Sequence, residues 1–164
     1  MPKPPLGVNP FIKSEQPEIK PLKFQSGSEK YISPSLKGKV TFDYSNNNGS
    51  YIIGAGDLAF ETHWSKAGDT SIHTTNYGPS IAGIGLALDA KEISEISDAT
   101  QCDMSSKYRT PREGEIVVAR NKNGYYAAMK VLDVKDRTRD DDKDELTFEY
   151  VILSNRKADF RQSY

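Results

Sequence analysis

The chain contains 164 residues, of which 36% are hydrophobic, and its formal net charge at pH 7 is −1. This length suffices for one domain of ordinary size with a hydrophobic core. The near-neutral charge argues against a dedicated polyanion-binding protein, which concentrates basic charge on one face, although a local basic patch fits within a neutral total. The single cysteine, Cys102, excludes an internal disulfide, and we expect it to be a small, buried or half-buried apolar side chain.

The sequence shows no feature of a membrane or secreted protein. No apolar run approaches the roughly 20 residues that a membrane-spanning helix needs. The N-terminus, MPKPPLGVNPF, lacks the apolar core of a signal peptide. We therefore expect a soluble, cytoplasmic protein, and we find no indication of a cofactor.

Residues 1–37 form a proline-rich segment that contains seven of the nine prolines. Each proline removes a backbone hydrogen-bond donor, and the remaining residues are mostly polar. We expect a flexible arm over residues 1–37, which is an untethered terminus, a docking arm or a linker from a partner domain. The folded domain is expected over residues 38–154, and a polar tail over residues 155–164.

The first half of the domain shows the alternation of β-strands. Apolar and polar residues alternate over residues 39–44, 51–54, 58–65, 71–77 and 81–89, with turn-forming residues between these segments. The last of them, IAGIGLALD, contains glycines where another backbone is expected to approach closely. Lys91–Asp98 is the one helical candidate, at about two turns.

The second half predicts three consecutive strands over residues 116–121, 125–135 and 146–153. Asn123-Gly124 between the first two is a strong hairpin signal, because a type I′ turn needs positive φ at both central residues. The expected fold is all-β, a single small barrel or sandwich with an SH3-like C-terminal three-strand unit. This likeness to an SH3 barrel is an analogy at the level of the fold, and it says little about function.

Two blocks of sequence resemble an uncharacterised bacterial domain that occurs alone or next to TIR-type signalling domains. The blocks are FDYSNNNGSYIIGAGDLAFETHWSKAGDTSIH, residues 42–73, and EGEIVVARNKNGYYAAMKVLDVKD, residues 113–136. The resemblance covers about residues 39–153 and consists of turns and aromatic residues, with no catalytic set. It implies a sensing or interaction module of a bacterial signalling or defence system.

Three residues form a candidate metal or acid–base site: Glu61, His63 and His73. If the hairpin loop centres on Gly68, His63 faces His73 across the strands, with Glu61 on the same face. Two imidazoles and a carboxylate at that distance could hold a metal ion. The register is an assumption, and two solvated histidines on a sheet surface are the ordinary alternative.

The loop at residues 135–145 combines six carboxylates with four basic side chains. Such oxygen ligands can bind Ca²⁺, but the loop lacks the glycine and the glutamate of an EF-hand. A mixed-charge hairpin loop is the expected reading.

Aromatic and basic side chains form the last candidate site. Exposed aromatic rings can stack on a nucleobase, a sugar or a proline ring. We expect a contact surface made of Trp64, His73, Tyr77, Arg120 and Tyr126. Core packing is the usual role of such aromatic residues.

No nucleophile, paired-carboxylate or phosphate-loop motif is recognisable in the sequence. We therefore expect a non-catalytic binding module whose partner is a protein or a small nucleotide-like ligand. The alternatives are a nucleic-acid-binding β-barrel and a metal-dependent hydrolase that uses His63 and His73. A subunit of a larger assembly is a further alternative.

Overall fold

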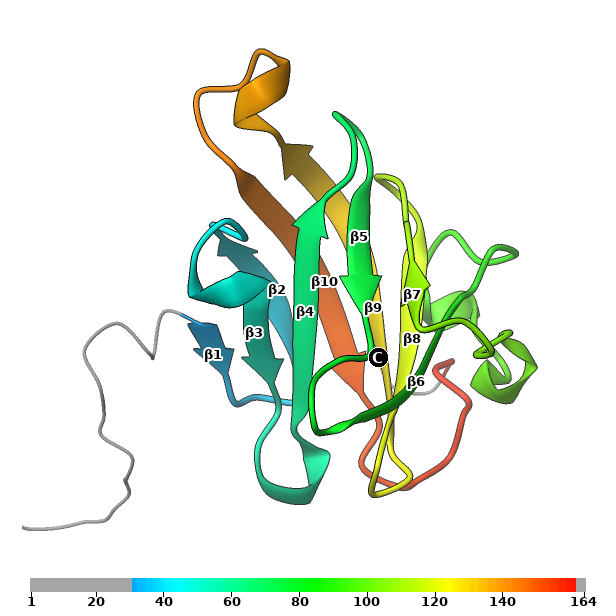
Figure 1. Ribbon diagram of the computed structural model, residues 1–164. Coiled ribbons are helices and arrows are strands. Elements are labelled where there is room, and N and C mark those ends of the chain that lie inside the picture. The colour runs from blue at the N-terminus through cyan, green and yellow to red at the C-terminus, as the bar shows by residue number, and fades with distance from the viewer. Residues whose placement is uncertain (1–30, 162–164) are drawn as a thin grey trace, which may run out of the picture. The chain divides into compact units, whose positions relative to one another are not determined.

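The computed structural model describes residues 31–161, which form ten β-strands in two five-stranded sheets (Figure 1). The prediction of an all-β fold is confirmed. Most of the proline-rich segment, residues 1–30, lies outside the described residues, as does the end of the tail. The strands are β1 (Ile32–Ser33), β2 (Lys37–Phe42), β3 (Ser50–Ile53), β4 (Phe60–Lys66), β5 (Ile72–Thr75), β6 (Ile81–Leu86), β7 (Tyr108–Arg109), β8 (Ile116–Asn121), β9 (Tyr126–Lys135) and β10 (Glu145–Ile152).

The first sheet has the strand order β1-β3-β4-β5-β7, and the second has the order β2-β10-β9-β8-β6. Neighbouring strands are antiparallel except for β1 and β3, which are parallel. Strands β8, β9 and β10 form a consecutive antiparallel unit, as the hairpin signals predict. The finer comparison of this unit with an SH3 barrel stays a prediction.

The two sheets pack face to face around one hydrophobic core, to which both contribute the inward side chains of alternating strands. Its centre is Phe148 on β10, whose ring stacks on Trp64 of β4 at a centroid distance of 5.3 Å. Tyr51, Phe42 and Tyr150 surround the same ring. In the segments 39–44 and 146–153, the apolar residues that alternate with polar ones are therefore those that point into this core.

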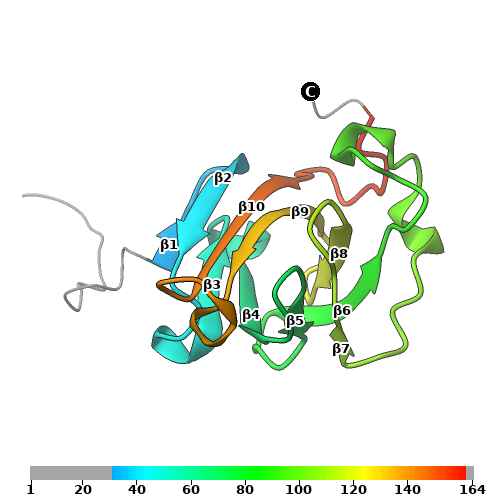
Figure 2. The same cartoon turned by 90° about the horizontal axis from the view of Figure 1, so that it is seen from above.

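The second sheet is buried on its outer face as well. There, Ile116, Val118 and Ala128 contact side chains from the loop after β6 and from the C-terminal segment, including Ile93 and the buried Phe160. Viewed from above, these segments lie outside β8 and β9, on the side away from the first sheet (Figure 2). Burial on both faces explains why β8 and β9 consist largely of continuous apolar residues instead of alternating ones.

The segment expected to be a short helix, Lys91–Asp98, contains a 3-10 turn of only three residues, Ile93–Glu95. A capping box between Glu92 and Glu95 defines this turn. The chain then extends, so that Ile93 and Ile96 both reach the second sheet. Within residues 31–161 all helical segments are three-residue 3-10 turns.

Other local predictions agree with the structure or extend it. At Gly85 on β6, an added Cβ would lie 2.7 Å from the carbonyl oxygen of Asp103, which confirms the close backbone approach. The structured part begins before residue 38, because β1 comprises Ile32–Ser33. The Tyr150 hydroxyl forms hydrogen bonds with Ser33 at the end of β1 and with Ser35 in the β1–β2 connection. Among the described residues, no helix is long and apolar enough to cross a membrane.

Candidate functional site

The outer face of the first sheet differs from that of the second because its side chains remain partly exposed. On β4 and β5 the inward residues are buried, whereas the outward ones are half-buried or exposed. The outward positions carry Glu61, His63, His73 and, on β7, Tyr108, which is 56% exposed. A solvent-facing sheet surface that carries imidazoles and an aromatic ring is a candidate contact surface.

His63 and Glu61 are paired, as their positions two apart on one strand predict. His63 Nε2 lies 3.0 Å from Glu61 Oε2, and the His63 side chain is 17% exposed. The carboxylate thereby fixes the orientation of the imidazole ring. Among the described residues, the other ring nitrogen of His63, Nδ1, forms no hydrogen bond, so it can bind a ligand.

The predicted pairing of His63 with His73 is wrong. In the structure His63 faces Thr75, and His73 faces Ser65. The loop spans residues 67–71 and centres on Asp69 instead of Gly68, which shifts the register by two residues. Because the shift is even, both histidines stay on the outer face, but they are diagonal neighbours instead of partners.

His73 instead belongs to the contact with β7. Its Nδ1 lies 2.8 Å from Thr110 Oγ1, and its ring meets Tyr108 edge-on at 6.1 Å between centroids. Across residues 31–161 there is no group of three or more His, Cys, Asp or Glu side chains that could hold a metal ion. Glu61, His63 and His73 therefore do not converge into the metal site considered from the sequence.

A depression of about 300 Å³ lies on this outer face. Tyr77, in the loop after β5, is 73% exposed and contributes an aromatic ring. The other lining residues contribute the His63 imidazole, an amide and two hydroxyl groups: Asn48, His63, Trp64, Ser65 and Thr75. An exposed ring surrounded by uncharged donors and acceptors suits a flat, polar ligand ring.

Two aromatic residues expected at the contact surface are core residues instead. Trp64 is 2% exposed, and its Nε1 donates a hydrogen bond to Thr62 Oγ1 at 2.7 Å. Tyr126 is 8% exposed and packs on the outer face of the second sheet, where it pairs with the exposed Arg120. Trp64 points into the core between the two sheets, whereas Tyr126 is covered on the outer face of the second sheet by the segments that pack there. Alternation alone does not show which faces of a sheet are covered, and this is why both rings were expected at the surface.

The charged loop at residues 135–145 is organised by Lys66, which the sequence analysis missed. Lys66 Nζ donates to Asp136 Oδ1 and to Asp144 Oδ1, each at 2.7 Å. Burial alone would raise the pKa of Asp136, but the hydrogen bonds from Lys66 and Thr138 outweigh it and hold that pKa well below its usual range. The loop carboxylates thus neutralise cations of the chain itself, as expected for a mixed-charge loop.

The same network affects Tyr44, which lies beside it. Burial, together with the negative charge of Asp144, raises the pKa of Tyr44 to about 12. The Tyr44 hydroxyl donates to the carbonyl oxygen of Lys135 at 2.6 Å. This residue ties β2 to the loop after β9 and is structural.

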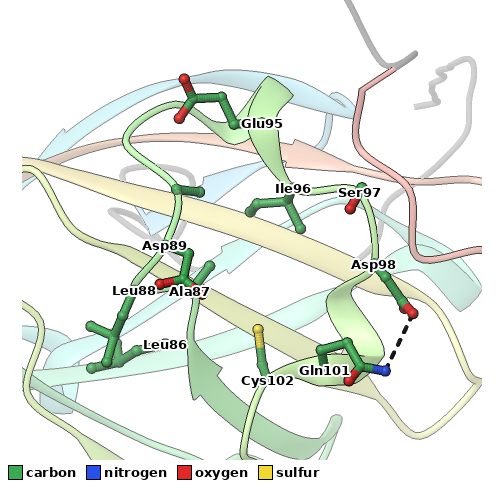
Figure 3. A pocket seen from close by; sticks show the side chains of 11 residues that line it. Leu86, Ala87, Leu88, Asp89, Glu95, Ile96, Ser97, Asp98, Gln101 and Cys102 are labelled. Carbon is green, nitrogen blue, oxygen red and sulfur yellow. Dashed lines mark hydrogen bonds between the residues drawn. The ribbon is translucent and has the colours of Figure 1, made fainter.

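A second cavity, of about 240 Å³, lies between the end of β6 and the two 3-10 turns that follow (Figure 3). Its carboxylates cap these turns: Glu95 accepts from two backbone amides, and Asp98 accepts from Thr100. The Cys102 thiol faces the cavity (Figure 3). Burial, and then the nearby Asp98, raise its pKa, so the thiol stays protonated at neutral pH and is a weak nucleophile.

Comparison with known proteins found no matching family model, no matching curated protein and no matching solved structure.

Proposed function

We propose that this chain is a non-catalytic binding module that recognises a small nucleotide-like ligand on the outer face of its first sheet. The observation that carries the proposal is the depression formed around Tyr77 and His63. Tyr77 supplies an exposed ring for stacking, and the imidazole, amide and hydroxyl groups beside it supply hydrogen bonds to a base or a ribose.

The rigidity of this site supports recognition. His63 is oriented by Glu61, and the core beneath the site is fixed by the stacking of Trp64 on Phe148. The face therefore combines a rigid base with a single, largely exposed ring at Tyr77. Rigid sites lose little conformational entropy on binding, which favours affinity for small ligands.

We further propose the setting that the resemblance implies, in which the protein is a cytoplasmic accessory or sensor module of a bacterial signalling or defence system. In that setting, ligand binding reports the presence of a nucleotide signal to a protein partner. The metal-dependent hydrolase receives less support, because His63 and His73 bind separate partners, Glu61 and Thr110.

The experiment is a titration with the four common ribonucleosides, followed by NMR of the isotope-labelled protein. We expect shifts at Tyr77 and His63. Loss of base–aromatic stacking removes about 1–3 kcal/mol per base, so Tyr77→Ser is expected to weaken binding by roughly 5- to 150-fold. The control is Leu88→Ser, which removes an exposed apolar side chain from the loop after β6 that does not line the depression.

Absence of binding by every nucleoside at millimolar concentration would overturn the proposal. Equal affinity of the Tyr77→Ser variant and the unmodified protein would do so as well. A protein partner bound through this face would then replace the nucleotide as the leading hypothesis.

A further inference from the structure

Four basic residues lie at one end of the second sheet, where the β8–β9 turn meets the segment after β10. They are Arg120, Lys122, Arg156 and Lys157, and all four are exposed. Within residues 31–161 none of these four forms an ion pair, whereas Lys66, Lys130 and Lys135, for example, each do. Figure 1 shows the β8–β9 turn beside the start of the C-terminal segment. We call this group the basic corner.

Arg156 is held in a fixed orientation in the basic corner. Its Nε donates to the carbonyl oxygen of Asn123 at 2.9 Å, and its guanidinium carbon lies 4.5 Å from the ring centroid of Tyr125. Its backbone has a φ of 58°, which is uncommon for a residue other than glycine. Among the described residues the hydrogen bond of Arg156 is made by Nε, so the two terminal nitrogens of the guanidinium group can bind an anion as a fork.

The turn beneath Arg156 is also rigid. Asn121 is buried, and its Oδ1 accepts hydrogen bonds from the backbone amides of Asn123 and Tyr125, both at 3.0 Å. Its Nδ2 donates to the carbonyl oxygen of Asp57 at 2.9 Å. Asn123 Nδ2 donates to the same carbonyl oxygen at 3.1 Å, so two side chains of the turn are tied to the segment before β4.

The basic corner adjoins the Tyr77 depression through the loop between β5 and β6. The backbone amide of Lys122 donates to the carbonyl oxygen of Ser80 at 2.8 Å. The hydroxyl of the same serine accepts from the backbone amide of Glu61, next to His63, also at 2.8 Å. Tyr77 lies three residues before Ser80 in this loop. The Tyr77 ring and the exposed Lys122 therefore lie at the two ends of one short, hydrogen-bonded loop.

We propose that the basic corner binds the phosphate groups of a single-stranded nucleic acid whose base stacks on Tyr77. Sites for single strands combine aromatic rings, which stack on bases, with basic side chains, which follow the backbone. Four separate cations suit a ligand that carries several phosphates. The stacking part rests on the proposed function above, whereas the phosphate contacts depend on the basic corner alone.

The test is fluorescence anisotropy of a labelled oligothymidylate of about ten nucleotides, a length within the usual range of single-strand sites. Binding is measured with the full chain between about 50 and 200 mM salt. Each neutralised phosphate contributes about −0.7 to the slope of log K against log salt, so four contacts predict a slope of roughly −3.

The variants are Arg156→Gln and Lys122→Gln, and each is expected to make the slope less negative by about 0.7. The Lys122 side chain makes no hydrogen bond or ion pair within residues 31–161, so this variant should fold normally even if Arg156→Gln does not. The matched control is Lys39→Gln, which removes the same charge from β2, at the opposite edge of the second sheet. Its slope and affinity should not change.

The outcomes separate this proposal from the proposed function. If nucleosides bind at Tyr77 but the oligonucleotide binds no tighter, the depression is the site and the basic corner is not. If Arg156→Gln and Lys122→Gln weaken oligonucleotide binding but Tyr77→Ser does not, the result supports phosphate binding at the basic corner and refutes base stacking on Tyr77. Equal weakening by Lys39→Gln, or equal binding to anionic phosphatidylserine vesicles, would overturn the inference.

Discussion

The strongest test of the core is the replacement of Phe148 by alanine. Phe148 is fully buried, and four aromatic rings surround it, including Trp64 at 5.3 Å. Truncation of a buried phenylalanine removes its transfer free energy and leaves a cavity, and the sum is about 3–5 kcal/mol. Since a domain has only about 5–15 kcal/mol of stability in total, Phe148→Ala is expected to be barely stable.

The magnitude can be measured by urea unfolding, because Trp64 is the only tryptophan in the chain and stacks on the deleted ring. At roughly 4 °C per kcal/mol for a domain of this size, the melting temperature should fall by about 12–20 °C. Phe148→Leu, which keeps a large apolar side chain, is expected to lose only about 1–2 kcal/mol. The emission of Trp64 should move to longer wavelength in the alanine variant.

A loss below about 1.5 kcal/mol in Phe148→Ala would refute this reasoning, because point substitutions of every kind already average about 1 kcal/mol. Equal losses in the alanine and leucine variants would also refute it. Either result would mean that the sheets do not rely on the aromatic cluster for their packing.

Two further predictions concern the backbone and the pH dependence. At Gly49, φ is 72° and an added Cβ would lie 2.0 Å from a β4 carbonyl oxygen, whereas at Gly56, φ is 58° and no atom lies within 4 Å. Gly56→Ala should therefore cost about 1–2 kcal/mol in urea unfolding and Gly49→Ala clearly more, and equal losses would contradict the assigned clash. The lowered pKa of Asp136 means that its stabilising contribution is present above the unfolded pKa, near 4, and is lost as the pH falls below it. Asp136→Asn should reduce stability at pH 7 and flatten its decline between about pH 5 and pH 2, whereas the exposed Asp142→Asn should do neither; an unchanged pH profile in Asp136→Asn would contradict the role of Lys66.

Much of the fold could be predicted from the sequence because the strands and turns are encoded locally. The alternation of residues 146–153 and the glycine at position 85 each reflect a local backbone requirement that the structure satisfies. The hairpin predicted at Asn123-Gly124 is present, but of these two residues Gly124 alone has a positive φ, so the turn is not of type I′. The Glu61–His63 pair was also predictable, because residues two apart on a strand share one face.

The remaining features depend on contacts between distant parts of the chain. Whether the loop after β4 centres on Gly68 or Asp69 decides the partners of both histidines, and both centres fit the local sequence. The segment Lys91–Asp98 is mostly extended instead of helical, because Ile93 and Ile96 both pack on the outer face of the second sheet. The basic corner joins residues more than 30 apart, and no local pattern reports such proximity.

The pairing of β2 with β10 has a consequence for how the chain acquires its fold. Phe42 faces Leu146, so the first long strand of the second sheet completes its ladder with the last strand. Closing such a long loop is entropically costly, and proteins with many distant pairings fold slowly. During synthesis, β2 cannot pair with β10 until β10 has left the ribosome, so the apolar face of β2 stays exposed until then. The charged Lys37 and Lys39 on this strand discourage association with other chains during that interval.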